Sequence, residues 1–284
     1  MSLLKKLLRF IPDKLYLQLM YKHHIGKFIN FNSPSTFNEK LQWLKLYDKK
    51  AAYTYLVDKY KAKKIVADAI GEEHIIRTYG VWDAPEKIDF DMLPNSFVLK
   101  WNHDSGSVVI CRDKKSFNKD DALAKLQAGK YRSGFWYGRE WPYKDVIPCV
   151  IAEEFIEGAD GDLPDFKFMC FNGEVKCSFV CTKRFSNEGL HVTFYDRDWQ
   201  RLPFARKYPT ERQDIAKPEH YEEMVALAEK LSRNIPFVRV DFYDVNGKIY
   251  FGEMTFFPGS GFEKFNPPEW DEKIGDWLTL PGNE

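Results

Sequence analysis

Residues 239–261 read RVDFYDVNGKIYFGEMTFFPGSG and contain two apolar runs that each carry an acid. Between the runs, Asp244-Val245-Asn246-Gly247 has the Asp and Gly positions of a type I turn closed by a left-handed glycine in a three-residue loop. The stretch therefore predicts an antiparallel hairpin. Asp241 and Glu253 stand where a strand normally places hydrophobic residues, so the direction in which they point decides what the hairpin can do.

The register of this hairpin decides whether the two acids share a face. The three-residue loop places Arg239 opposite Glu253 and makes Asp241 a diagonal neighbour of Glu253. All three side chains then share one face, because side chains alternate along a strand. A two-residue turn formed by Asn246 and Gly247 would instead shift the register and split the acids between the two faces. We expect the three-residue loop.

Two carboxylates and an arginine on one sheet face fit a divalent cation together with the anion that it serves. Mg²⁺ is usually bound by one or two carboxylates plus phosphate oxygens. The alternative is a surface hairpin with an ordinary cross-strand ion pair, which is common on exposed strands. The hairpin by itself does not choose between the two interpretations.

The composition predicts a globular protein with a sizeable core. The chain has 284 residues, 44% hydrophobic and 30% charged, which is enough for one large domain or two smaller ones. Lys+Arg and Asp+Glu balance at 42 each, which argues against nucleic acid as a partner. The five cysteines are odd in number and contain no C-x-x-C pair, so neither a disulfide framework nor a zinc site is expected.

The N-terminal segment is amphipathic. One predicted helical face carries Leu3, Leu4, Leu7, Leu8, Phe10 and Ile11, the other carries Lys5, Lys6 and Arg9, and Pro12 ends the helix. Packing on the protein's own core is the favoured use, and peripheral contact of residues 2–11 with an anionic membrane surface is the alternative. Since no apolar run reaches the roughly 18 residues of a membrane span, we expect a cytoplasmic enzyme, with the inner face of the membrane as the alternative location.

The remaining pattern predicts an α+β protein with mainly antiparallel sheets. Residues 1–78 are helical in pattern, with a capping signal at 35–39 and a second helix over 51–71. From residue 79 onward, strand-like runs alternate with turns and with helices at 120–128 and 218–233. The runs cover residues 95–101, 107–112, 149–156, 165–173, 174–181, 191–195, 237–243 and 248–254. Asn-Gly pairs at 172–173 and 246–247 favour hairpins.

Two of the strand-like runs lead into polar residues that suit nucleotide chemistry. Lys100 ends one run, and the loop after it has a Ser105-Gly106-Ser107 tip whose backbone N–H groups can approach a phosphate. An ordinary solvent-exposed turn is the alternative there. In CVIAEEFIEG, an apolar run leads into Glu153 and Glu154, which resembles an edge that grips adenine. Its alternative is a strand that ends in solvated acids.

A third stretch, DLPDFKF, places Asp165 and Lys167 on the same face of a predicted strand. A simple salt bridge between the two side chains is the alternative to a functional role. By themselves, the two residues do not show whether they have a functional role or form only a salt bridge.

Taken in chain order, the motifs resemble the ATP-grasp superfamily, and specifically its TupA-like branch. They are VDKY with Lys59, VLK with Lys100, AEEFIEG, DFKF, and RVDFY followed by GEMTFFPGSG; the N-terminal SPSTFNEKLQWLKLYD also looks like that branch. The resemblance covers nearly the whole chain. It implies an ATP-grasp fold with a helical region at 1–78, a phosphate-loop lobe at 79–150, and a lobe at 151–284 that carries the adenine edge and the metal hairpin.

The resemblance also implies cofactor-binding residues. Lys59 and Lys100 match the lysines that contact the ATP phosphates, Glu153 matches the acid at the adenine amino group, and Asp165 matches the ribose-binding acid. The whole implied set is Lys59, Lys100, Ser105, Gly106, Ser107, Glu153, Glu154, Phe155, Ile156 and Asp165.

The catalytic and metal-binding residues follow from the same resemblance. Asp241 and Glu253 match the Mg²⁺ carboxylates, and Thr255 is a further candidate ligand that stands where the superfamily often has Asn. Arg239 matches the arginine that steadies the transferred phosphoryl group. Lys167 stands where related ligases have a basic residue that faces phosphate or substrate.

The implied activity is ATP- and Mg²⁺-dependent formation of an amide from a carboxylate and an amine through an acyl-phosphate. The TupA-like branch occurs with cell-surface polysaccharide genes. It implies a sugar uronate or an amino acid as carboxylate donor, and an amino acid, peptide or amino sugar as acceptor, either as small molecules or linked to a lipid.

Two other classes of function compete with this interpretation. Asp160-Gly161-Asp162 is a D-x-D string of the kind with which metal-dependent glycosyltransferases hold a nucleotide sugar, but it is short and lies in a predicted loop, so we interpret it as an incidental acidic turn. A nucleotide-binding module without catalysis is the second competitor. The presence of Asp241, Glu253 and Arg239 argues against that module.

Overall fold

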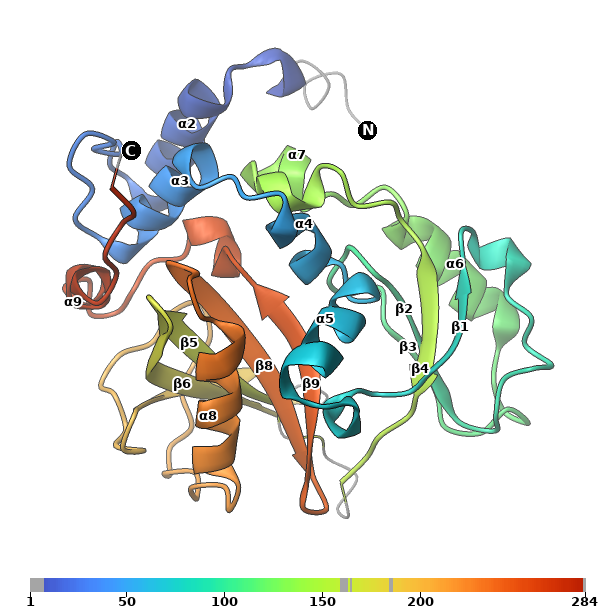
Figure 1. Cartoon of the computed structure of the whole chain (residues 1–284). Helices are drawn as coiled ribbons and strands as arrows, with labels where there is room; N and C mark the ends of the chain where they lie inside the picture. The colour runs from blue at the N-terminus through green and yellow to red at the C-terminus, as the bar shows by residue number, and fades with distance from the viewer. Residues whose placement is uncertain (1–7, 159–162, 164, 184–185, 283–284) are drawn as a thin grey trace.

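Two antiparallel sheets and a set of helices make up the structure, which is a computed structural model that describes residues 8–158, 163, 165–183 and 186–282 (Figure 1). The smaller sheet has four strands in the order β1-β4-β2-β3, and the larger sheet has five in the order β7-β6-β5-β8-β9. Every neighbouring pair in both sheets is antiparallel. The predicted α+β class is confirmed.

The strands follow the predicted runs closely. The smaller sheet contains β1 (Thr78–Trp82), β2 (Phe97–Trp101), β3 (Val109–Cys111) and β4 (Val150–Glu154). The larger sheet contains β5 (Asp165–Phe171), β6 (Glu174–Thr182), β7 (His191–Asp196), β8 (Phe237–Val245) and β9 (Lys248–Thr255). Only β1 had no predicted counterpart. It is an edge strand without a fully buried face, and its pairing with β4, far along the chain, holds it.

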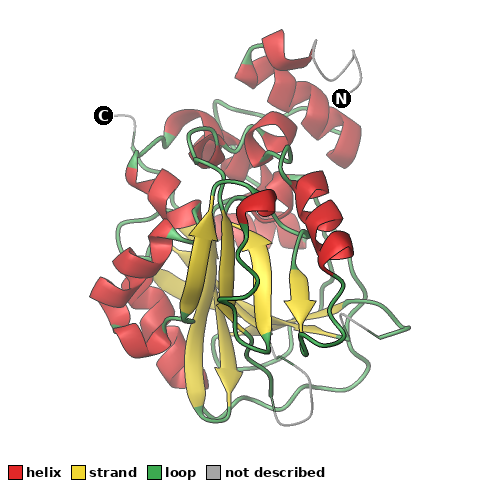
Figure 2. Ribbon diagram, turned by 90° about the vertical axis from the view of Figure 1, so that its right-hand side faces the viewer, coloured by secondary structure: helices red, strands yellow, loops and turns green. Residues whose placement is uncertain are grey.

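Helices cover both sheets and cap the upper end of the molecule as drawn in Figure 2. The α-helices are α2 (Asp13–Ile25), α3 (Phe37–Tyr47), α4 (Ala52–Val57), α5 (Lys61–Ile70), α6 (Lys119–Gly129), α7 (Gly134–Gly138), α8 (Tyr221–Leu231) and α9 (Trp270–Asp276). Short 3-10 helices lie at η1 (Leu8–Phe10), η2 (Glu72–His74), η3 (Pro85–Lys87), η4 (Trp141–Tyr143) and η5 (Pro258–Gly261). Helix α8 packs on β5, β6 and β8, whereas α6 packs on β2 and β3.

Two separate hydrophobic cores underlie the two sheets. The larger core joins helices α2 to α5 to the five-stranded sheet, so the N-terminal helices share that core and do not form one of their own. The smaller core lies between the four-stranded sheet and α6. Strand β4 belongs to the smaller sheet, so the sheets divide after Glu154, whereas the sequence placed the division at residues 150/151.

The predicted single helix over residues 51–71 is wrong, because the chain breaks it at Asp58-Lys59-Tyr60. Asp58 leaves the helical region with φ −76° and ψ 107°. Its side chain accepts hydrogen bonds from the backbone N–H groups of Tyr60 at 2.9 Å and Lys61 at 3.1 Å. Asp side chains offer the backbone this alternative to helix, and the break leaves Lys59 between two helices.

The predicted three-residue hairpin loop is also wrong. Val245 pairs with Lys248, so Asn246 and Gly247 form a two-residue turn, with φ 52° and 77° at the two positions. Both residues adopt positive φ, as this tight hairpin turn requires.

A β-bulge at Gly252 nevertheless keeps both acids on one face. The ladder runs in register from the turn to the Phe242–Phe251 pair, and it then shifts by one residue so that Asp241 lies directly opposite Glu253. The extra residue in β9 is Gly252, where an added Cβ would lie 3.2 Å from the Asp241 carbonyl oxygen. The shared face is thus confirmed, although through a register that the sequence did not predict.

The described part of the N-terminal segment forms η1, and Pro12 stands directly before α2. Ile11 packs against the larger core, whereas Phe10 is 86% exposed. Residues 2–7, which hold half of the predicted apolar face, lie outside the described residues. Among the helices that the structure describes, none has the length and apolar character needed to cross a membrane.

Thr36 caps helix α3 through the predicted capping box. Its hydroxyl oxygen accepts from the backbone N–H of Glu39 at 3.2 Å, and the Glu39 carboxylate accepts from the backbone N–H of Thr36 at 3.4 Å. We expect Thr36→Ala to lower the free energy of unfolding by about 1 kcal/mol, because an N–H at the helix start loses its acceptor. Thr36→Ser keeps the hydroxyl oxygen, so its free energy of unfolding should fall much less. Urea denaturation followed by circular dichroism measures both, and equal losses would contradict the capping role.

Candidate active site

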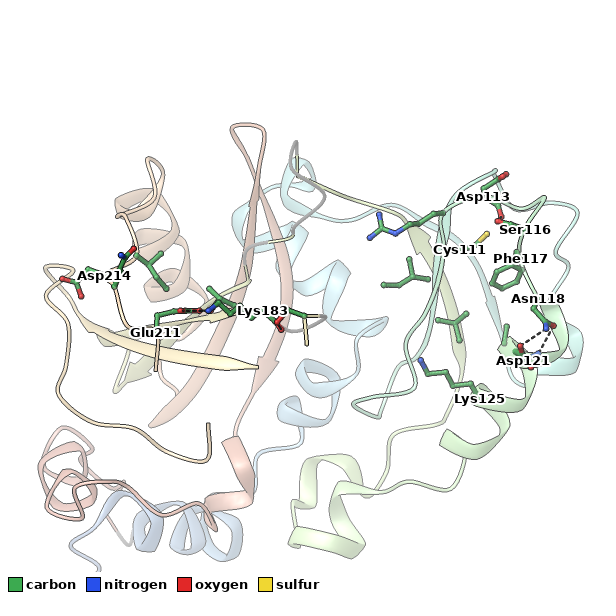
Figure 3. Close-up of a pocket in the computed structure, with 18 residues that line it drawn as sticks. Cys111, Asp113, Ser116, Phe117, Asn118, Asp121, Lys125, Lys183, Glu211 and Asp214 are labelled. Carbon is green, nitrogen blue, oxygen red and sulfur yellow. Dashed lines mark hydrogen bonds and ion pairs between the residues drawn. The ribbon is translucent and has the colours of Figure 1, made fainter. Parts of the chain in front are cut away.

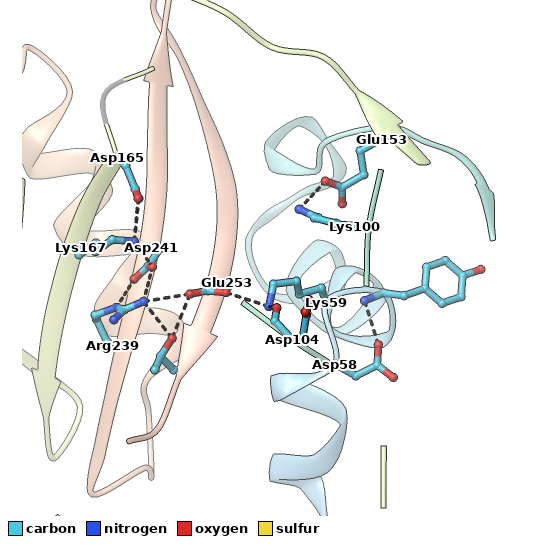
Figure 4. A network of polar contacts seen from close by, with 12 residues as sticks. Asp58, Lys59, Lys100, Asp104, Glu153, Asp165, Lys167, Arg239, Asp241 and Glu253 are labelled. Carbon is cyan, nitrogen blue, oxygen red and sulfur yellow. Dashed lines mark hydrogen bonds and ion pairs between the residues drawn. The ribbon is translucent and has the colours of Figure 1, made fainter. Parts of the chain in front are cut away.

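The buried carboxylate of Asp241 is the centre of a polar network on the larger sheet (Figure 4). Asp241 is 1% exposed. Arg239 donates to it from Nε at 2.7 Å and from Nη2 at 2.6 Å, and the same Nη2 donates to Glu253 at 2.9 Å. The predicted alternative of an ordinary surface hairpin is therefore wrong.

Strand β5 adds a second cation to the network. Lys167 pairs directly with Asp241 across the β5–β8 ladder. Its Nζ donates to Asp165 at 2.9 Å and forms a short ion pair with Asp241. The predicted Asp165–Lys167 salt bridge exists, but it is part of a larger buried cluster.

Charges inside the cluster shift one another's pKa values. Burial raises the pKa of the Asp241 carboxyl, and Arg239 and Lys167 oppose that effect. For Glu253, burial acts in the same direction but is outweighed, because Lys59, Arg239 and Lys167 hold its pKa far below the usual range. The carboxylates raise the pKa of Lys167 despite its burial. The cluster therefore concentrates both signs of charge on the wall of one cavity.

Lys59 connects the network to the smaller lobe. Its Nζ lies 3.1 Å from Glu253 Oε2 and donates to the backbone carbonyl of Asp104 at 3.0 Å. Its backbone N–H donates to the carbonyl of Asn102 at 3.0 Å, so the helix break and the loop after β2 fix each other. Figure 4 shows the Lys59 side chain directed toward Glu253.

The loop after Lys100 is anchored by a buried amide. Asn102 is fully buried, donates from Nδ2 to the Ile147 carbonyl at 3.0 Å, and accepts from the Cys149 backbone N–H at 2.9 Å. This anchor leaves Ser105 and Gly106 exposed at the tip, with Gly106 at φ 101°. Ser107 differs, because it is buried and its hydroxyl donates to Asp104.

Glu153 lies in a separate buried ion-pair group. It is 3% exposed, and its carboxylate lies 2.5 Å from Lys100 Nζ and 2.7 Å from Lys63 Nζ. Although burial would raise the pKa of this carboxyl, the two lysines hold it below its usual value. The predicted alternative of a strand that ends in solvated acids is therefore wrong for Glu153. Phe155 and Ile156 follow the end of β4, and Arg112 stacks on the Phe155 ring at 4.9 Å.

One cavity of about 440 Å³ collects most of the predicted site residues. Its lining includes Lys59, Lys100, Ser105, Gly106, Asp165, Lys167, Arg239, Asp241 and Glu253. The rest of its wall comes partly from apolar residues on the same face of β6 and β7, such as Phe179 and Val192. Glu153, Glu154, Phe155, Ile156 and Ser107 do not line it, and Thr255 lines the adjacent cavity.

The two facing carboxylates fit Mg²⁺ only together with ligands from outside the chain. Among the described residues, no group of three or more His, Cys, Asp or Glu side chains is placed to hold a metal on its own. Asp241 and Glu253 do fit a cation whose remaining ligands are phosphate oxygens and water. The Thr255 hydroxyl instead accepts from Arg239 at 3.0 Å and donates to Glu253 at 3.3 Å, which makes it a support for the cluster.

Sequence patterns missed several residues that the structure brings to this region. Lys63 lies one helical turn after Lys59, and that spacing could have indicated it. A second cavity of about 980 Å³ beside the first is lined by His103, Glu140 and Arg206, which no motif singled out. The Asp160-Gly161-Asp162 string lies outside the described residues.

A third cavity, of about 1180 Å³, lies elsewhere (Figure 3). Residues around β3 and α6, including Cys111 and Lys125, form one side, and Lys183, Glu211 and Asp214 form the other. None of the predicted site residues lines this cavity. Its size alone does not make it the candidate site.

All five cysteines lie in the described part of the chain, and none of them forms a disulfide. Four of the five are buried. The structure thus agrees with the prediction that no disulfide framework supports the fold.

The chain matches a protein-family model over most of its length. The family described as TupA-like ATPgrasp matches residues 39–279. No curated protein matches the chain.

Similar solved structures are ligases of low sequence identity. D-Alanine-D-alanine ligase from Helicobacter pylori is 16% identical, with 88% of this chain and 68% of that chain covered and a TM-score of 0.48. The Bacillus anthracis D-alanine–D-alanine ligase complexed with ATP is 18% identical, with 71% and 55% covered and a TM-score of 0.41. N5-carboxyaminoimidazole ribonucleotide synthetase from Thermus thermophilus is 13% identical, with 77% and 51% covered and a TM-score of 0.42. The chain thus spans little more than half the length of the last two.

The Glu153 ion pairs predict a pH-dependent contribution to stability. Its pKa is below the ordinary value of 4.5 in the folded protein, so the stabilisation is present above that pH and is lost as the pH falls through the folded value. We expect Glu153→Gln to lower the free energy of unfolding at pH 7 by about 2 kcal/mol, because two partly buried lysines lose their counter-charge.

Urea denaturation at pH 7 and at steps below pH 4.5 measures this effect, and the difference from the unmodified protein should shrink on acidification. Glu154→Gln changes the next residue on the strand and should alter stability by less than about 0.5 kcal/mol. A Glu153→Gln loss that stays constant with pH would contradict the ion-pair explanation.

Proposed function

Because the chain belongs to the TupA-like ATP-grasp family, we propose that it is an ATP-dependent ligase that joins a carboxylate to an amine through an acyl-phosphate. One observation carries the proposal. Lys59, Lys167 and Arg239 come from three distant segments and meet the facing carboxylates Asp241 and Glu253 at one cavity. Such a cluster suits a polyphosphate and a metal ion, since the transfer of a phosphoryl group depends on positioned charge.

We propose a role for each side chain, supported by its position in the cavity. Lys59 and Lys100 bind the ATP phosphates next to the backbone of Ser105 and Gly106. Arg239 and Lys167 offset the charge on the phosphoryl group as it moves to the substrate carboxylate. Asp165 lines the same cavity and is proposed for the ribose.

Asp241 and Glu253 would hold Mg²⁺, which neutralises charge on the β- and γ-phosphates when it is bound. Thr255 orients Arg239 and Glu253 through its hydroxyl. In this structure the two carboxylates are paired with cations of the protein. We propose that phosphates and metal replace part of these pairings when ATP binds.

The adenine contacts are assigned to the end of β4. Glu153 with the backbone of Glu154, Phe155 and Ile156 is proposed to meet the adenine amino group. Glu153 is held by Lys100 and Lys63 in this structure, so adenine would share that carboxylate with the lysines.

The proposed biological setting is the synthesis of a cell-surface polysaccharide such as a capsule. The carboxylate donor is proposed to be a sugar acid, either small or lipid-linked, and the acceptor an amino acid or peptide. The reaction would take place in the cytoplasm, with residues 2–11 as a proposed peripheral contact to the inner face of the membrane.

Nucleotide binding can be tested by thermal denaturation. ATP with Mg²⁺ should raise the melting temperature, because the binding residues meet only in the folded chain; a ligand at one hundred times its Kd stabilises by about 2.7 kcal/mol. The Asp241→Asn variant should still bind ATP without metal, but added Mg²⁺ should raise its melting temperature little. It should release no ADP when candidate carboxylates and amines are supplied. If UDP-glucose raises the melting temperature and ATP does not, the glycosyltransferase interpretation replaces the ligase.

Arg239 offers a test of the chemical step. Its fork donates through Nε and Nη2 to Asp241, and lysine cannot reproduce that planar geometry. We expect Arg239→Lys to lower turnover by about two orders of magnitude at saturating ATP, the scale seen when one preorganised stabiliser is lost.

The affinity of the Arg239→Lys enzyme for ATP should change far less than its turnover. Arg197→Lys, at an exposed arginine that pairs with Glu222 through Nη1 at 2.8 Å, is the matched control. Near-normal turnover of Arg239→Lys would remove the proposed transition-state stabiliser from the mechanism.

A further inference from the structure

The second cavity, of about 980 Å³, adjoins the proposed ATP site. It shares Lys59, Arg239 and Glu253 with the first cavity, so it reaches the end at which phosphoryl transfer would occur. Its volume is within the range of small-molecule sites. The nucleotide roles assigned above leave its other walls unused.

Arg206 lies at the junction of the two cavities and lines both. Its side chain is 7% exposed, and its Nε and Nη2 atoms are buried without a hydrogen-bond partner among the described residues. The Glu263 carboxylate lies 3.6 Å from Nη2, beyond hydrogen-bond distance, and the guanidinium stacks on Phe265 at 4.8 Å. A buried guanidinium without hydrogen bonds is costly, so this one indicates that hydrogen-bond acceptors, such as the oxygens of a carboxylate, belong beside Nε and Nη2.

A second buried nitrogen on the same cavity also has no partner. His103 is 9% exposed, and its Nε2 makes no hydrogen bond within the described part of the chain. Its Nδ1 lies 3.3 Å from the Asn102 side-chain oxygen, which fixes the ring. Together with Arg206, this histidine indicates that the cavity receives a polar ligand.

The same cavity also presents a buried acid. Glu140 is 8% exposed and accepts a hydrogen bond from the Ser260 hydroxyl. Burial raises the pKa of this carboxyl even though Lys45 lies near it. The ionised carboxylate of a group with a raised pKa is a stronger base, so it can accept a proton from an ammonium group. Arg206 and Glu140 thus offer one cavity both a cation and a proton acceptor, which complements a zwitterion.

We propose that this cavity binds the amine substrate as a free amino acid, with its carboxylate on Arg206 and its amino group toward Glu140. The inference rests on the proposed ligase function, and it names the acceptor class. The guanidinium fork suits a planar carboxylate that is not consumed in the reaction. The carboxylate that reacts with ATP lies instead at Arg239.

The bound amino acid attacks an acyl-phosphate that has formed in the first cavity. Its ammonium group gives one proton to Glu140, and the neutral amine forms the N–C bond. The C–O bond to phosphate breaks with its electron pair on the phosphate, which takes the second proton of the amine. The carboxylate on Arg206 is unchanged throughout.

Calorimetric titration of the full chain tests the carboxylate contact. The probes are alanine, lysine and glutamate in both configurations, each compared with its α-amide, with and without the non-hydrolysable ATP analogue AMP-PNP and Mg²⁺. At least one free amino acid should bind, and its α-amide should bind about 30-fold more weakly or worse. Arg206→Gln should weaken the binding of the free amino acid by about the same 30-fold factor, while its affinity for AMP-PNP should stay within about threefold of that of the unmodified protein. Arg206→Lys should have an affinity for the amino acid between those of the two proteins.

Two controls separate this role from a structural one. Arg233→Gln removes an exposed arginine beyond the end of α8 that lines neither cavity, and it should change nothing. Glu263→Gln removes only the nearby counter-charge and should leave amino-acid binding equal or tighter. Melting temperatures of the unliganded variants show whether each still folds.

Several outcomes would overturn the inference. They are α-amides that bind as well as acids, no binding of any amino acid in the panel, unchanged binding by Arg206→Gln, or a loss of AMP-PNP affinity that matches the loss of amino-acid affinity. If Arg206→Gln weakened the binding of galacturonate but not of amino acids, Arg206 would instead bind the carboxylate-donor substrate. That result would also overturn the inference. Failure of AMP-PNP to bind would overturn the ligase proposal separately, because the amino-acid titration without nucleotide still reads out Arg206.

Discussion

The buried carboxylate of Asp241 is the constraint around which the site is arranged. A carboxylate that is 1% exposed must be compensated by nearby charge, and Arg239 and Lys167 both supply it. Because these cations come from β8 and β5, the ladder between the strands has to be in register for the cluster to exist. The same cations are the ones proposed to meet the transferred phosphoryl group.

The two parts of the structure, each built on its own core, are joined by polar contacts. Lys63 on α5, which packs in the larger core, pairs with Glu153 on β4. Lys59, at the break between α4 and α5, donates to the carbonyls of Asp104 and Asn102. Each hydrophobic core stays within its own lobe. Under the proposed function, polyphosphate entering the cavity would compete for the lysines that now link the lobes. Nucleotide binding would then act on the contacts that set the distance between them.

Two buried arginines in the site differ in how fully they are satisfied. Arg239 bonds to Asp241, Glu253 and Thr255, so its position is fixed before any ligand arrives. Arg206 has two buried nitrogens without partners among the described residues. Under the two proposals, Arg239 is already fixed in position for the chemical step, whereas Arg206 binds the second substrate next to it.

Local sequence determined the strands, the capping box at Thr36, and the hairpin that carries both acids, because side-chain alternation and turn chemistry act over a few residues. It did not determine the register, since the bulge at Gly252 depends on how β9 packs beside β8. Edge strand β1 and the helix break before Lys59 were missed for a related reason, because β4 and the loop after β2 hold them from far along the chain. The partners of Glu153 and the unpaired nitrogens of Arg206 were decided by tertiary structure alone, since ion pairs between distant segments leave no periodic signal in the sequence.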